Sequence, residues 1–305
     1  MSTLTTESTS TPPVARSGHR RHLGAARRSN LLTIAMLALL VYFLFPLFWL
    51  VVAATKTTGD LFSTFGLWFG HGFALFSNIS QTFSHNGGEY GRWLANTFVY
   101  SVVSAVGAAF LAALGGYGFA KYRFAGNSPL FGVVLGSIMV PTTALAIPTY
   151  LLFSKVHLVN TPWAIILPSL VSPFGLYLMR IYAQDAVSDS ILEAARIDGA
   201  GEFRIFFQVA MRSLAPGFVT VLLFTLVATW NNYFLPLIML NSSDLYPITV
   251  GLAQLQSAAN AGGGSQALFS TVITGSLVSI VPLVLAFLFL QRYWQSGLAT
   301  GGVKG

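Results

Sequence analysis

The chain has 305 residues, of which 54% are hydrophobic and only 8% are charged, and its formal net charge is +7. A soluble domain carries about a quarter charged residues, so this composition excludes an ordinary soluble protein and indicates a membrane protein. The chain contains no cysteine, which excludes disulfides, Cys-ligated zinc and thiol nucleophiles.

Residues 1–29 are expected to form a disordered, basic tail. Eight of the first eleven residues are Ser or Thr, and Pro12-Pro13 and several arginines follow, so there is little to bury. The apolar block at 31–54 is longer than the core of a normal secretory signal, although Val52-Ala53-Ala54 could mimic a cleavage site. An uncleaved first helix is therefore the favoured interpretation.

Long uncharged stretches predict six transmembrane helices, because a bilayer is crossed by roughly 20 apolar residues in a helix. The stretch 245–291 is too long for one span, and its first part, with Asn260 and the glycines at 262–264, is expected to be a loop. The predicted helices lie near 30–54, 93–118, 129–153, 162–181, 214–240 and 268–290, within one six-helix transmembrane domain at 30–290 that leaves 291–305 as a tail.

The basic residues predict the orientation of the chain. If the amino end is cytoplasmic, the outer segments hold only Lys56, Arg92 and Lys155, and the inner segments hold the other 13 of the 16 basic residues. This satisfies the positive-inside rule and places both termini in the cytoplasm. It also argues against nucleic acid as the reason for the positive charge.

No ionisable residue falls in the middle of a predicted span, whereas ion-coupled carriers usually keep one there. The five histidines lie outside the spans without the spacing of a metal site, and no HExxH, GxSxG or phosphate-binding loop is present. We therefore expect no catalytic residues, no metal and no cofactor. Uphill transport would take its energy from another subunit.

The second predicted helix carries a small residue at every fourth position: Ser104, Ala108, Ala112, Gly116 and Ala120. Such a row lets a neighbouring helix approach closely in lipid. Static packing is the favoured interpretation, and a contact that moves during gating is the alternative.

The segment 183–213 predicts a short charged helix, a sharp turn and a second amphipathic helix. Ser188 or Asp189 can cap the first helix, and Glu193 and Arg196 can pair on its surface. Asp198-Gly199 can end it, because glycine adopts the left-handed conformation of a helix stop. The second helix begins near Glu202 and is expected to bury Phe203, Phe206 and Phe207. The pattern fits a docking element and an ordinary interfacial helix pair equally well.

Four stretches resemble the permease subunits of bacterial ATP-binding-cassette (ABC) importers of the carbohydrate-uptake, maltose-type second-permease family. The run from Glu193 to Phe207 resembles the EAA loop of the superfamily. Three further stretches resemble the carbohydrate branch: Trp230–Leu237, Leu245–Leu252, and the ending with Gln291-Arg292-Tyr293, Gly297-Leu298 and Gly301–Gly305. The resemblance covers about residues 90–305.

This resemblance implies an all-α integral membrane fold of the type I ABC importer permeases, with six transmembrane helices and a cytoplasmic EAA coupling-helix loop, in the bacterial cell membrane. It implies as partners a second homologous permease, two ATPase subunits that hydrolyse ATP, and an extracytoplasmic solute-binding protein. The coupling positions carried over to this chain are Glu193, Ala194, Ala195, Asp198 and Gly199.

The resemblance further implies a carbohydrate substrate, with alternating access about a site near the middle of the bilayer. Aromatic rings and amides suit sugars at Trp230, Asn231, Asn232 and Tyr233, but buried amides also find partners on neighbouring helices. The glycine-rich loop 253–268 would face outside and probe the binding protein, or act only as a connector. Contacts of the tail with the ATPase are expected at Gln291, Arg292, Tyr293, Gly301 and Lys304.

The sequence departs from the family pattern at two places. Val209-Ala-Met211-Arg212 stands where the family usually has Ile-x-Leu-Pro, and Asn232 stands where it has an acidic residue, which removes a negative charge. Two alternatives stay open: a permease for a non-sugar solute, and a facilitator or channel that needs no motor.

Overall fold

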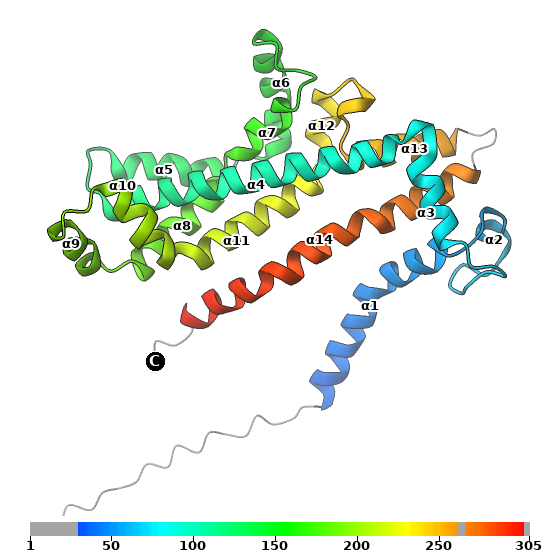
Figure 1. Cartoon of the computed structure of the whole chain (residues 1–305), viewed down its shortest axis with the longest axis horizontal. Helices are drawn as coiled ribbons and strands as arrows, with labels where there is room; N and C mark the ends of the chain where they lie inside the picture. The colour runs from blue at the N-terminus through cyan, green and yellow to red at the C-terminus, as the bar shows by residue number, and fades with distance from the viewer. Residues whose placement is uncertain (1–29, 262–265, 302–305) are drawn as a thin grey trace, which may run out of the picture. The chain divides into compact units, whose positions relative to one another are not determined.

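The computed structural model describes residues 30–261 and 266–301, with backbone alone for Arg292 and for 294–301. Contacts within the chain form two units, divided between Leu47 and Phe48. In the first unit the described residues are helical. The second unit contains the remaining helices (Figure 1). The principal described helices are α1 (Asn30–Ala54), α2 (Thr58–Ser63), α3 (Leu75–Ser84), α4 (Glu89–Lys121), α5 (Asn127–Ile138), α6 (Ala146–Lys155), α7 (Trp163–Leu170), α8 (Pro173–Ala186), α9 (Asp189–Ile197), α10 (Glu202–Ile205), α11 (Met211–Trp230), α12 (Phe234–Met239), α13 (Ile248–Asn260) and α14 (Gln266–Gly301).

The described residues contain five helices that are long and apolar enough to cross a membrane, and a bent pair of helices that makes a sixth span if it is counted as one. This agrees with the six predicted spans. The pair is Asn127–Ile138 with Thr142–Lys155, bent by 97°, so the straight helix predicted at 129–153 is wrong. The break falls at Pro141, which has no N–H to donate and disfavours helical geometry at Val140 before it.

Two other predicted spans are also interrupted. The span at 162–181 consists of α7 and α8, because Pro173 begins a new helix in which the Ser172 hydroxyl accepts a hydrogen bond from the Gly175 N–H (3.1 Å). Within this span Arg180 lies before the end of α8, and its guanidinium stands 3.7 Å from the centre of the Phe131 ring, a cation–π contact. The charge is thus held against an aromatic face.

The predicted helix at 214–240 ends early, at Trp230, and a short helix, α12, follows from Phe234. The predicted loop after 245 is also wrong in part, because α13 occupies Ile248–Asn260. The glycines at 262–264 lie outside the described residues. The apolar and small residues of 248–259 form a helix whose buried face packs on α4 and α14.

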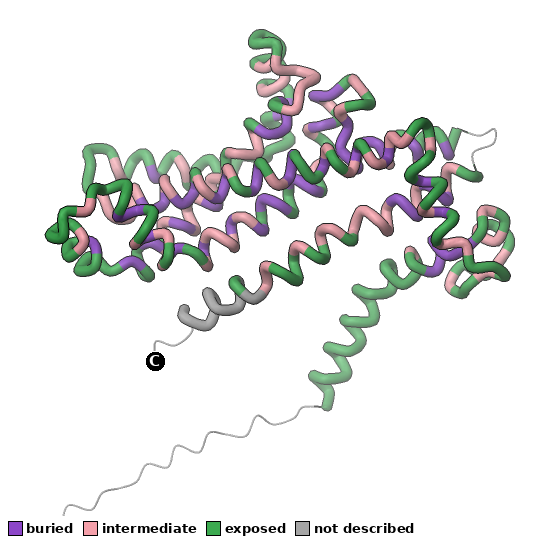
Figure 2. Tube along the Cα trace, viewed as in Figure 1, coloured by how far each residue is buried: buried purple, intermediate pink, exposed green. Residues whose placement is uncertain are grey.

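Helix α4 is the centre of the second unit, and it packs along α8 and α11 (Figures 1 and 2). Its row of small residues faces these neighbours: Ser104, Ala108, Ala112 and Gly116 are buried, and Ala120 is half-buried. A β-carbon on Gly116 would stand 2.6 Å from the backbone nitrogen of Arg180 and 2.6 Å from the β-carbon of Met179. The row therefore serves close helix packing in this structure.

The amino-terminal half of α4 binds the irregular segment that follows α12. The Trp93 indole donates to the Ser243 carbonyl (3.0 Å), the Asn96 amide to the Asp244 carbonyl (2.7 Å), and the Tyr100 hydroxyl to the Leu245 carbonyl (3.0 Å). The ring of Trp93 leaves no space for a side chain at Gly251, where a β-carbon would meet it at 2.2 Å. These contacts fix the backbone between α12 and α13.

We predict that Gly116→Ala lowers the thermal unfolding midpoint of the purified protein, because the added methyl group must push α8 away from α4. Overpacking of this kind costs about 1–3 kcal/mol. The matched control is Gly118→Ala on the same helix, where a β-carbon meets nothing within 4 Å. Unchanged midpoints for both variants would contradict the close packing of α4 on α8.

Candidate functional site

The segment 183–213 projects a short helix, α9, from the second unit. Ser188 is the residue before its first turn, with its hydroxyl bonded to that of Ser190 (2.7 Å) and no capping bond to the backbone. Leu192 is the buried residue of the helix and contacts the same apolar cluster as Tyr117 and Met179 of the bundle. One buried leucine thus fixes the helix to the core.

Helix α9 ends at Ile197 and is followed by a Schellman motif, with Gly199 as its left-handed residue. The Ala200 N–H donates to the Ala195 carbonyl (3.0 Å) and the Gly199 N–H to the Arg196 carbonyl (3.0 Å). Gly199 has φ of +79°, a conformation that side-chain-bearing residues rarely adopt. The predicted helix stop at Asp198-Gly199 is therefore confirmed. The carbonyls of Ala195 and Arg196, which have no partner within the helix, accept these two hydrogen bonds.

The chain after this turn forms α10, a π-helical turn at Phe206–Ala210, and α11 without a break. Ile205 and Phe206 are buried, but Phe203 is 81% exposed and Phe207 52% exposed, so the prediction that all three phenylalanines are buried is wrong. Phe203 and Phe207 each lie two residues from Ile205, which turns them toward the opposite side of the helix. Phe207 instead stacks on Phe110, with ring centres 6.0 Å apart.

The predicted pair between Glu193 and Arg196 does not form. The Arg196 Nε donates to Glu202 Oε1 instead (2.8 Å), because the turn at Gly199 brings Glu202 back beside α9. The Tyr122 hydroxyl donates to the other oxygen of Glu202. Hydrogen bonding to Glu202 raises the pKa of Arg196, and burial is the main cause of the raised pKa of Tyr122.

Another ion pair, between Asp189 and Lys121, joins the start of α9 to the end of α4. Lys121 Nζ lies 2.8 Å from Asp189 Oδ1, and the side chain of Lys121 is only 8% exposed. This hydrogen bond with Lys121 is the main reason that the pKa of Asp189 is lowered. The segment is therefore linked to the end of α4 on both sides of the Gly199 turn, through Asp189 and through Glu202.

The predicted coupling residues share the outer surface of this segment. Glu193, Ala194, Asp198 and Gly199 are exposed, and Ala195 is half-buried. Beside them the apolar side chain of Ile197 is 86% exposed. Because alanine and glycine leave a low surface next to exposed apolar groups, this face suits contact with another protein.

The residues at the end of α11 do not converge on one site. Trp230 is buried, and it lines an open apolar groove of about 460 Å³ together with Leu94, Phe98 and Pro282. The amide of Asn231 donates to the Val227 carbonyl of its own helix (2.9 Å). Tyr233 is 42% exposed.

Asn232 has a local structural use. Its side-chain oxygen accepts a bond from the Leu235 N–H (3.4 Å), and its carbonyl accepts one from the Thr249 hydroxyl (2.8 Å). These two hydrogen bonds stabilise the non-helical backbone between α11 and α12. An uncharged amide is sufficient for these bonds.

The carboxyl-terminal residues are described only in part. Gln291 and Tyr293 belong to α14, and the Gln291 amide donates to the Leu288 carbonyl (3.2 Å). The structure describes only the backbone of Arg292 and Gly301. Lys304 lies outside the described residues. In the described part of the chain no three His, Asp or Glu side chains gather as metal ligands.

The residues that sequence reasoning missed are Lys121, Tyr122 and Glu202. Lys121 is one of the 13 basic residues assigned to the inner segments, and its charge alone does not indicate a partner. The position of Glu202, shortly after the glycine that ends α9, was the available signal for that residue. The contact of Tyr122 with Glu202 joins residues 80 positions apart, which no local pattern shows.

Comparison with known proteins gives the family. Residues 105–298 match the family described as "Binding-protein-dependent transport system inner membrane component". The chain is 34% identical to the arabinooligosaccharides transport system permease protein AraQ of Bacillus subtilis (strain 168), over 90% of this chain and 95% of that protein. It is 31% identical to the lactose transport system permease protein LacG of Rhizobium radiobacter, over 86% and 91% of the two chains.

The fold is similar to that of a chain in the crystal structure of a bacterial ABC transporter involved in the import of the acidic polysaccharide alginate. The TM-score is 0.75 at 20% identity, over 87% of this chain and 95% of that chain. The family match spans well over half of the sequence. The chain therefore belongs to the binding-protein-dependent transport system inner membrane components, the membrane-spanning permeases of ABC importers.

Proposed function

We propose that this chain is one transmembrane subunit of an ATP-driven importer of oligosaccharides, with both termini in the cytoplasm. The observation that carries the proposal is the exposed face of α9, with Leu192 buried in the bundle and the segment bound to Lys121, at the end of α4, and to Tyr122 after it. The sugar is supported by the relatives, which are named as permeases for arabinooligosaccharides and for lactose.

The coupling role rests on how the segment 183–213 is connected. Its apolar residues Leu192, Ile205 and Phe206 belong to one buried cluster with Tyr117 of α4 and Leu214 of α11. Complete burial of such a side chain stabilises by about 1.5–3 kcal/mol, whereas an exposed ion pair contributes much less. Packing therefore makes the segment rigid, and the ion pairs set its orientation.

A partner ATPase would bind the face formed by Glu193, Ala194, Ala195, Asp198 and Gly199. When two ATPase subunits close on ATP, they would displace α9, and the buried cluster would carry this motion into α4 and α11. Helix α11 ends at Trp230, so the motion reaches the proposed sugar pathway. The permease would thus alternate between inward-facing and outward-facing states, together with a second permease subunit.

The sugar pathway is proposed along Trp230, Asn231, Asn232 and Tyr233. Asn231 and Tyr233 have exposed surface that a sugar could meet, and Trp230 and Asn232 would support them from behind. A solute-binding protein would deliver the sugar from outside, near the connection of α13 with α14. The carboxyl-terminal residues Gln291, Arg292, Tyr293, Gly301 and Lys304 would contact the ATPase.

We predict that Gly199→Val abolishes uptake while membrane insertion continues. Valine is strained at a φ of +79°, so the turn opens, but its β-carbon meets nothing within 4 Å inside this chain. Uptake of labelled sugar into proteoliposomes with the complete complex measures the effect. Gly201→Val is the matched control, since that glycine also has free space and no positive φ. Equal uptake by both variants would count against a docking role of the turn.

We predict that Asp189→Asn lowers the sugar transported per ATP hydrolysed, because it removes the negative charge that pairs with Lys121 and so weakens the link of α9 to α4. Asp185→Asn on α8 is the control, since Asp185 is exposed and has no ion pair among the described residues. The ratio of uptake to phosphate release is measured for each. The double variant with Lys121→Met should be no worse than Asp189→Asn alone; an additive loss would show that the two residues act separately.

The substrate class is tested with the solute-binding protein that delivers substrate to the assembled transporter. Its affinity for arabinooligosaccharides, lactose and raffinose is measured, followed by ATP-dependent uptake of any sugar that binds. Binding of an amino acid or polyamine and of no sugar would replace the carbohydrate assignment. Uptake that persists without ATP would replace the ABC mechanism with a facilitator.

A further inference from the structure

Residues 55–84, which make up the connection from α1 to the end of α3 and are called the connection below, have an inverted distribution of polarity. Its four buried residues are all polar: Thr55, Lys56, Asn78 and Thr82. Within these residues, all of which the structure describes, no apolar side chain is buried. A connection surrounded by water normally buries apolar groups and exposes polar ones.

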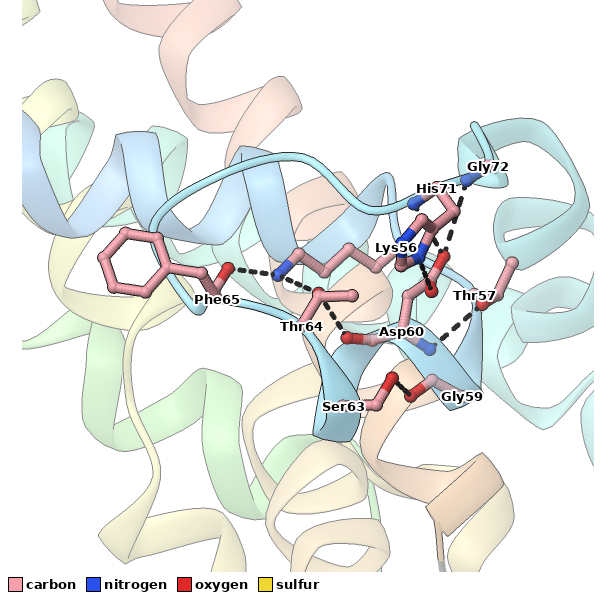
Figure 3. A network of polar contacts seen from close by, with 9 residues as sticks. All are labelled: Lys56, Thr57, Gly59, Asp60, Ser63, Thr64, Phe65, His71 and Gly72. Atoms are coloured by element: carbon pink, nitrogen blue, oxygen red, sulfur yellow. Dashed lines mark hydrogen bonds and ion pairs between the residues drawn. The ribbon is translucent and has the colours of Figure 1, made fainter.

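The inward polar groups are satisfied by the connection itself. Lys56 is 1% exposed, and its Nζ donates to the Thr64 hydroxyl (3.0 Å) and to the Phe65 carbonyl (2.8 Å), as Figure 3 shows. The Asn78 amide donates to the carbonyls of Ala54 (2.9 Å) and Lys56 (2.8 Å). It thereby occupies carbonyls that the end of α1 leaves without helical partners.

The carboxylate of Asp60 is also used internally. Its Oδ1 lies 2.9 Å from the His71 Nδ1, and its Oδ2 accepts a bond from the His71 backbone N–H (3.1 Å) (Figure 3). The hydrogen bond with His71 is the main cause of the lowered pKa of Asp60. Lys56, Asp60 and His71 are the only residues of the connection that can be charged, and His71 alone has a largely exposed side chain.

The outward surface is aromatic. Six side chains of the connection are between 47% and 76% exposed: Phe62, Phe65, Trp68, Phe69, Phe73 and Phe76. Two pairs of these rings are in contact. Trp68 and Phe69 meet edge to face with ring centres 5.9 Å apart, and Phe73 and Phe76 are tilted with ring centres 6.1 Å apart. We call these six residues the aromatic face.

The aromatic face lies at the ends of two candidate membrane spans. The connection begins directly after α1, which ends at Ala54. The Phe62 ring meets the Phe269 ring, near the start of α14, with centres 5.7 Å apart. The face therefore continues the apolar surface of these spans at the level where a bilayer meets water, which is the level that aromatic side chains favour.

We propose that the aromatic face is embedded in the interfacial layer of the bilayer and contacts lipid. Because Lys56 and Asp60 are turned inward and hydrogen-bonded within the connection, neither places its charge on the aromatic face. A docking site for a binding protein would face water whenever that protein leaves, and six exposed aromatic rings are unfavourable there. Anchored in this way, the connection fixes the depth of the ends of α1 and α14.

Site-directed fluorescence quenching tests this proposal, and the natural absence of cysteine makes single-cysteine labelling clean. A bimane label is attached at Phe65→Cys, Phe73→Cys or Gly66→Cys in the assembled transporter. The transporter is placed in nanodiscs of phosphatidylethanolamine and phosphatidylglycerol, with or without nitroxide-bearing lipid. Gly66→Cys keeps all six aromatic residues and adds a β-carbon with nothing within 4 Å, so it controls for damage to the face.

All three labels should lose fluorescence with nitroxide lipid and resist quenching by aqueous iodide. A label at Asn86→Cys, an exposed polar position beyond α3, should show the reverse. Iodide quenching at the three positions would overturn the proposal by placing the face in water. Protection from both quenchers would overturn it by placing the face against protein, either the second permease or the binding protein.

Discussion

Backbone groups within a bilayer must find their hydrogen-bond partners inside the protein, and this constraint governs the architecture of the second unit. The chain leaves helical geometry after Trp230 and again between α12 and α13. In the second of these segments, the side chains of Trp93, Asn96 and Tyr100 donate to the backbone carbonyls of the 3-10 turn Ser243–Leu245. Helix α4 is thus both the packing centre and the main source of polar partners, which is why irregular backbone can persist beside the proposed pathway.

The same helix also binds the segment 183–213. Lys121 and Tyr122 lie at and just after the end of α4, and they bind Asp189 and Glu202 on either side of the Gly199 turn. The proposed sites at the two ends of the permease therefore share one helix. The close approach at Gly116, between these ends, keeps α4 and α8 in contact along the path.

The sequence predicts those features that depend on local composition. Long apolar runs predicted six spans, the glycine after Asp198 predicted a helix stop, and every fourth small residue predicted the packed face of α4. Breaks inside spans were missed, because Pro141 and Pro173 could equally have produced kinks within continuous helices. The helix at Ile248–Asn260 was missed because it lies in the same uncharged stretch as the glycines at 262–264, and no charged residue marks where the helix ends and the glycines begin.

The contacts of the segment 183–213 could be predicted only in part. Glu193 and Arg196 have the spacing of a surface pair, but Glu202 competes for Arg196 once the chain has reversed at Gly199. Burial of Phe203 and Phe207 was overestimated because apolar character alone does not say which side of a helix faces the bundle. The choice of Ile205 and Phe206 depends on tertiary packing against Tyr117 and Leu214.

A π-helical turn spans Phe206–Ala210, just before Arg212, the position where the family pattern usually has a proline. The Met211 N–H donates to the Phe206 carbonyl and closes this turn. A wide turn holds one residue more than an α-helical turn, so it shifts the angular phase of everything before it by roughly 100°. Because no break separates Glu202 from Trp230, this phase is carried over a rod of 29 residues, about 43 Å long. A one-residue change in that turn would re-aim the surface proposed to bind the ATPase without altering a single residue on it.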